Sequence, residues 1–194
     1  MYTFKTFFVL TLASYVIAAP PADEPAECKP MKEKEEEISK CCKLEAVTVK
    51  EQAAFVDCMK LVKDTDKKGP PKPEGFECLD DCILSKTGSL GSDKKIDPAK
   101  INAAAKTTYT GDWAEPGAKM IEKCLAQVAE NKDKTVCSTS GADVYTKCIF
   151  RESYINCPEK SWTNSDACKA NKERVIKCPK TLPYIGEQFK AETR

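Results

Sequence analysis

Residues 142–158, ADVYTKCIFRESYINCP, carry the pattern that decides the fold of this chain. Apolar residues recur at helical spacing along one face of this stretch: Val144, Tyr145, Cys148 and Ile149. This spacing predicts an amphipathic helix that begins at about Ala142 and ends before Cys157, because Pro158 disfavours helical backbone at the residue before it. Cys148 lies on the apolar face, where a disulfide to a neighbouring helix can form.

The same helical spacing recurs in six other segments of the chain. We expect helices over about residues 33–44, 48–63, 76–87, 97–109, 114–128 and 166–177, and a tail, residues 182–189, that folds back onto them. Gly88 suits the end of the third helix, and Asp97 followed by Pro98 suits the start of the fourth. No segment shows the alternation of a strand. The sequence therefore predicts an all-α fold, a compact bundle of six to seven short helices cross-linked by about six disulfides around an apolar cavity.

The first 18 residues have the pattern of a secretory signal peptide. Lys5 supplies a basic start, an apolar run follows to Ala18, and Val16 and Ala18 are the small residues of a cleavage site. A membrane anchor is the alternative, but the run is short for a bilayer and a proline-rich stretch comes next. We expect residues 19–194 to form a single helical domain that is secreted into extracellular fluid.

Charge and cysteine content narrow the class of protein. The leader contains one of the 31 basic residues and none of the 30 acidic ones, so the mature chain has no net charge. This balance argues against nucleic acid or an anionic membrane as a partner. Twelve cysteines behind an export signal predict six disulfides in an oxidising compartment.

The chain contains no histidine, which removes the usual base of hydrolases and a frequent zinc ligand. We expect no enzyme activity, no cofactor and no metal site. The adjacent carboxylates Asp80 and Asp81 point about 100° apart on a helix and are interpreted as solvated. Glu152 falls within the apolar arc of its helix, and we favour a rim residue paired with a lysine or arginine over a ligand contact.

The cysteine spacing resembles that of the insect odorant-binding proteins. Three residues separate Cys78 from Cys82, 41 lead on to Cys124, and eight separate Cys148 from Cys157, which Pro158 follows directly. The pattern most resembles the Plus-C branch of that family, which has extra cysteines and a proline after the sixth conserved one. The additional cysteines here are Cys28, Cys41, Cys42, Cys137, Cys168 and Cys178.

The resemblance implies three bridges, Cys58–Cys82, Cys78–Cys148 and Cys124–Cys157, with the other six cysteines paired among themselves. Either Cys58 or Cys42 can take the role of the first conserved cysteine.

The resemblance also implies a carrier that binds small hydrophobic molecules, such as odorants or pheromone-like ligands, and delivers them to chemosensory receptors. The candidate pocket residues lie on the apolar faces: Phe55, Met59, Val62, Phe76, Leu79, Ile83, Trp113, Ile121, Leu125, Val128, Tyr145 and Ile149. The alternative is a disulfide-rich interaction or scaffold protein with no small-molecule cavity. Without an imidazole, ligand affinity should change little between pH 7 and pH 6, unless a carboxyl group has a strongly raised pKa.

Overall fold

The computed structural model describes residues 25–28, 38–43, 53–58, 78–132 and 139–183. Within these ranges the α-helices are α1 (Ile38–Cys41), α3 (Leu79–Thr87), α4 (Pro98–Thr108), α5 (Ala114–Glu130), α6 (Ala142–Ile155) and α7 (Asp166–Lys177). Residues 53–58 are also helical. Short 3-10 turns occur at η1 (Ala26–Cys28), η3 (Gly111–Trp113) and η5 (Glu159–Ser161). Within the described ranges no strand occurs, and the all-α prediction is confirmed.

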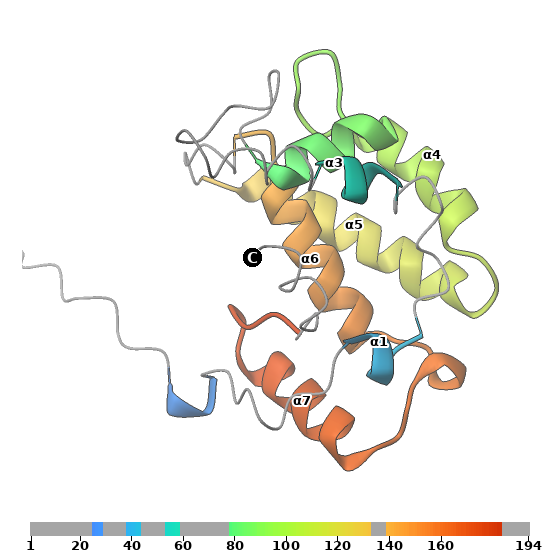
Figure 1. Ribbon diagram of the computed structural model, residues 1–194, viewed down its shortest axis with the longest axis vertical. Helices are drawn as coiled ribbons and strands as arrows, with labels where there is room; N and C mark the ends of the chain where they lie inside the picture. Colours follow the sequence, from blue (N-terminus) through green and yellow to red (C-terminus); the bar gives the residue numbers. More distant parts are fainter. Residues whose placement is uncertain (1–24, 29–37, 44–52, 59–77, 133–138, 184–194) are drawn as a thin grey trace, which may run out of the picture.

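The two longest helices, α5 and α6, pack against each other at the centre of the bundle. Figure 1 shows α3 and α4 on one side of this pair and α1 and α7 on the other. The contacts follow this order, because α4 packs on α5, α3 packs on α6, and α7 packs on α6 from the opposite direction.

The ends of several helices are fixed by the residues that the sequence singled out. The side chain of Asp97 accepts hydrogen bonds from the backbone amides of Ala99 and Lys100 at the start of α4, with Pro98 in the first turn. Gly88 ends α3 in the left-handed conformation at φ 81°. The predicted helices over 33–44 and 48–63 are described only at α1 and residues 53–58, and most of the 182–189 tail lies outside the described residues.

Buried side chains form two clusters on either side of the α5–α6 pair. The first lies between α4, α5 and α6 and contains Ile101, Met120, Ile121, Cys124, Tyr145 and Cys148. The second lies where α1 and α7 meet the end of α6 and contains Cys41, Cys42, Trp113, Tyr154, Cys157, Cys168 and Val175. Tyr109 packs against both clusters and joins them.

Disulfides lie within each cluster and outside them, and two of the three implied bridges are wrong. The structure contains Cys28–Cys178, Cys41–Cys168, Cys42–Cys157, Cys58–Cys82 and Cys124–Cys148. Cys58–Cys82 agrees with the bridge that the resemblance implied. Cys148 and Cys157 pair with cysteines other than those that the resemblance implied. Cys78 is also disulfide-bonded, and Cys137 lies outside the described residues.

The packing explains both corrections. Cys124 and Cys148 face each other where α5 packs on α6, so the shortest link across that interface joins these two cysteines. Cys42 forms an isolated antiparallel bridge with Trp162, which holds it beside Cys157 at the end of α6. The additional cysteines therefore do not pair only among themselves, because Cys42 takes the partner that the family pattern gave to Cys124.

Peptide mapping of the unreduced protein tests this connectivity. Trypsin cleaves after Lys123 and Lys147, so we expect the peptide CLAQVAENK, which begins at Cys124, to be joined to CIFR, which begins at Cys148. Mass spectrometry should detect this pair as one species that reduction splits into two. Recovery of CIFR joined to the peptide that carries Cys78 would contradict the structure.

Candidate ligand-binding sites

A hollow of about 510 Å³ opens between α4 and α5. Its walls are mostly small or apolar: Asn102, Ala105, Lys106 and Tyr109 on the α4 side, and Ala114, Ala118 and Ile121 on α5. The alanines leave space between the two helices because their side chains end at Cβ. Ile121 is buried and belongs to the α4–α5–α6 cluster, so the hollow lies directly against that cluster.

Gly117 sets how closely the end of α4 approaches α5. A Cβ atom at this position would lie 2.5 Å from Cβ and Cγ of Tyr109, so only glycine lets the tyrosine lie against the helix. Tyr109 lines the hollow from this position. This contact is not predictable from helical spacing, because neither Gly117 nor Tyr109 is part of an apolar stripe.

The structure brings only part of the predicted pocket together. Ile121, Leu125, Val128, Tyr145 and Ile149 pack on one another in the α4–α5–α6 cluster. Trp113 lies in the other cluster, and Phe55, Leu79 and Ile83 are partly buried on residues 53–58 and α3. Met59, Val62 and Phe76 lie outside the described residues. Of these twelve, Ile121 borders the hollow, and the pocket as a whole stays a prediction.

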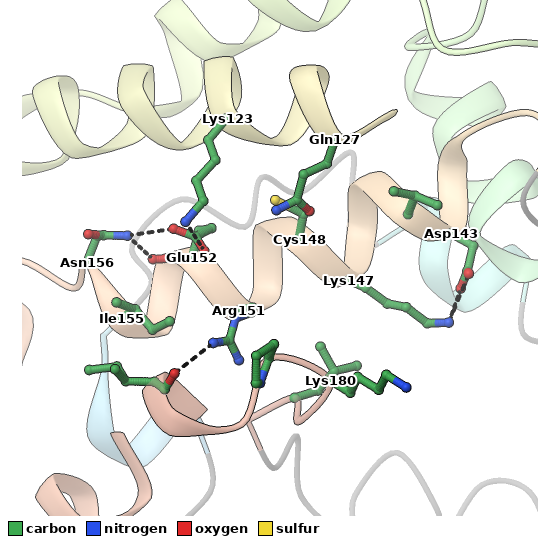
Figure 2. Close-up of a pocket in the computed structure, with 14 residues that line it drawn as sticks. Lys123, Gln127, Asp143, Lys147, Cys148, Arg151, Glu152, Ile155, Asn156 and Lys180 are labelled. Carbon is green, nitrogen blue, oxygen red and sulfur yellow. Dashed lines mark hydrogen bonds and ion pairs between the residues drawn. The ribbon is translucent and has the colours of Figure 1, made fainter. Parts of the chain in front are cut away.

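A larger groove, of about 820 Å³, lies between α6 and the segment that follows α7, and Lys123 and Gln127 border it from α5. Figure 2 shows charged side chains along it, with Lys123 reaching from α5 toward Glu152 and Arg151 reaching from α6 toward the opposite wall. This composition differs from the apolar cavity that the sequence predicts.

Glu152 forms an ion pair with a lysine, as predicted from the sequence. Its Oε1 lies 2.8 Å from Nζ of Lys123, and Asn156 Nδ2 donates a hydrogen bond of 3.2 Å to Oε2. The residue is 4% exposed, so it is a buried carboxylate and not a rim residue. Burial is tolerated because both oxygens have partners.

Arg151 holds the end of α7 against α6. Its Nη1 donates hydrogen bonds of 3.0 Å to the carbonyl oxygens of Cys178 and Thr181, and Nη2 donates one of 3.4 Å to that of Ile176. A cation at these carbonyls interacts favourably with the C-terminal end of a helix. Burial lowers the pKa of the Arg151 guanidinium, which remains charged at neutral pH.

The Asp80–Asp81 pair is not solvated as predicted. Asp80 faces α6, where burial, followed by the negative charge of Asp143, raises its pKa from 3.8 to about 6. A hydrogen bond with Thr146 opposes the shift, Asp81 adds to it, and Lys147 opposes it more weakly. The chain therefore has a carboxyl group that titrates where a histidine would.

No group of acidic residues or cysteines in the described ranges could hold a metal ion.

The comparisons with known proteins agree with the cysteine pattern. No family model matches the chain, and no solved structure matches it. A curated relative, general odorant-binding protein 67 of Anopheles gambiae, is 28% identical over 154 residues, which cover 72% of each chain. This match confirms the resemblance to the insect odorant-binding proteins, and the twelve cysteines and helical bundle fit that family. The relative is named for binding and not for catalysis, which agrees with the expectation that this chain is not an enzyme.

Asp80→Asn should change how stability depends on pH. Because the folded-state pKa of Asp80 is raised, its contribution to stability is fully present below about pH 4 and is lost as the pH rises through about 6. We expect the wild-type free energy of unfolding to fall by on the order of 1 kcal/mol more than that of the variant between pH 5 and pH 7.5, a figure reduced for partial exposure. Urea unfolding at the two pH values measures this difference.

Asp166→Asn is the matched control, since this aspartate is fully exposed at the start of α7. It should keep the wild-type pH dependence. An Asp80→Asn variant with the wild-type profile would show that Asp80 is solvated after all.

Proposed function

We propose that this chain is a secreted carrier that binds small hydrophobic molecules in extracellular fluid and delivers them to chemosensory receptors. The observation that carries the proposal is the hollow between α4 and α5, which is open, mostly apolar and about 510 Å³ in volume. Small-molecule sites fall between roughly 300 and 1,000 Å³. The relative named as an odorant-binding protein, the predicted leader and the disulfides support the same function.

The stability of the cross-linked bundle helps it to tolerate such a hollow. Unfilled space beside a core is unfavourable, at about 24 cal/mol per Å³ for a dry cavity, so helices tend to close over it. Cys124–Cys148 fixes α5 on α6, one turn along from Ile121 at the edge of the hollow. Each disulfide contributes roughly 2–4 kcal/mol to the stability of the bundle as a whole, so several bridges together help it to tolerate incomplete packing between α4 and α5.

The walls of the hollow favour an apolar ligand with one polar group. Alanine side chains and Ile121 provide apolar surface, and burying such surface contributes about 25 cal/mol per Å². Tyr109 and Asn102 line the same space, and tyrosine and asparagine are residue types that can hydrogen-bond a ligand oxygen. A small alcohol, ketone or phenol with a hydrocarbon body has this combination.

Ala118→Arg tests whether ligands occupy this hollow. Ala118 is exposed on α5 and lines the hollow, so an arginine there fills the space and adds charge without disturbing the core. We expect the affinity for small apolar alcohols and ketones to fall about tenfold, equivalent to about 1.4 kcal/mol. Displacement of the probe N-phenyl-1-naphthylamine from the oxidised mature chain measures it.

Ala126→Arg on the same helix is the matched control, since Ala126 is exposed and borders neither cavity. It should bind ligands as the wild type does. Equal affinities for the two arginine variants would show that the ligand binds elsewhere in the bundle. No saturable probe uptake by the wild type would favour an interaction or scaffold protein over a carrier.

A further inference from the structure

The groove between α6 and the segment after α7 has an excess of positive charge. Four basic and two acidic side chains line it: Lys123, Lys147, Arg151, Lys180, Asp143 and Glu152. Each acid is bound by one lysine, at 2.8 Å for Glu152 with Lys123 and 2.8 Å for Asp143 with Lys147. Within each pair the positive and negative charges cancel. Arg151 and Lys180 therefore carry the excess positive charge of the groove.

Arg151 forms no ion pair in the described part of the chain, although the nearby carboxylate of Glu152 partly opposes the effect of burial on its pKa. Its hydrogen bonds go to backbone carbonyl oxygens, which carry no formal charge. The neighbouring carboxylate of Glu152 is held by Lys123 and Asn156. The guanidinium is therefore a fixed positive charge in the wall of the groove, with few hydrogen-bond donors left for a ligand.

Lys180 supplies a second positive charge. It is exposed, lines the groove and makes no ion pair within the described part of the chain. In Figure 2 its side chain extends toward the same end of the groove as Lys147, from the opposite wall. Its ammonium group can donate hydrogen bonds to an anion at that end.

Apolar residues line the same groove. Ile176 on α7 is 52% exposed, which is unusual for a large aliphatic side chain in this structure. A single exposed isoleucine is ordinary, but Ile176 shares the groove with Ile155, Leu182 and Val144. A ligand that fits here needs an extended hydrocarbon part as well as a negative charge.

We propose that this groove is a second binding site, which takes a long-chain carboxylate with its head near Arg151 and Lys180 and its chain against Ile155 and Ile176. The volume of about 820 Å³ lies within the usual range for ligand sites. A singly charged head suits the groove better than a phosphate, since three hydrogen bonds of Arg151 already go to backbone carbonyls and fewer donors remain for several anionic oxygens. The proposal extends the carrier function by a ligand class that the α4–α5 hollow does not favour.

Isothermal titration of the oxidised mature chain with dodecanoate and with dodecan-1-ol tests this site. The wild type should bind the acid about fivefold more tightly than the alcohol, and Lys180→Gln should remove most of that difference, since an exposed ion pair contributes about this factor. Ile176→Ser should weaken both ligands about fivefold or more, because it removes apolar contact from the groove. Both residues are exposed, so folding should not change.

Lys132→Gln is the matched control, an exposed lysine two residues after α5 that lines neither cavity. It should keep the wild-type preference for the acid. If both groove variants bind dodecanoate as the wild type does, the groove proposal is overturned, whereas displacement of N-phenyl-1-naphthylamine by small alcohols would leave the carrier function standing. If dodecanoate binds in the groove but small apolar molecules do not bind, the groove proposal stands and the α4–α5 function falls. Absence of binding by either class overturns both.

Discussion

The position of α6 is the constraint on which the rest of the structure depends. Cys124–Cys148 ties its first half to α5, and Cys42–Cys157 ties the chain two residues beyond its end to the residue directly after α1. Cys41–Cys168 then extends the link from α1 to α7. Adjacent cysteines at 41 and 42 thus hold the end of α6 and the start of α7 together. These covalent links restrict how far the helix can rotate or slide.

This fixed helix separates two cavities of different character. On one side, α5 is held against α6 while small side chains leave space toward α4, which gives the apolar hollow. On the other side, Arg151 spans from α6 to the carbonyl oxygens at the end of α7, and Cys28–Cys178 holds the same end covalently. The groove there is lined by charges because α6 turns its polar residues toward a short, partly exposed segment.

Local signals predicted the helices well. Asp97 with Pro98, Gly88 and the residues at both ends of 142–155 fix helix termini through backbone geometry and capping, which depend on a few neighbouring residues. The burial of Asp80 could not be predicted in this way, because it depends on α3 packing against Asp143 and Thr146 more than 60 residues away. Arg151 was missed for the same reason, since its partners lie 25 to 30 residues farther along the chain.

The sequence by itself determined the helical class, the oxidising compartment expected from the leader and cysteines, and the resemblance to odorant-binding proteins. These follow from periodicity, composition and spacing, which are properties of the chain in order. Only the tertiary structure decided that Cys148 pairs with Cys124 and Cys157 with Cys42, and which faces leave cavities. Pairing and cavities depend on distances between helices, and those are set by side-chain packing that no linear spacing specifies.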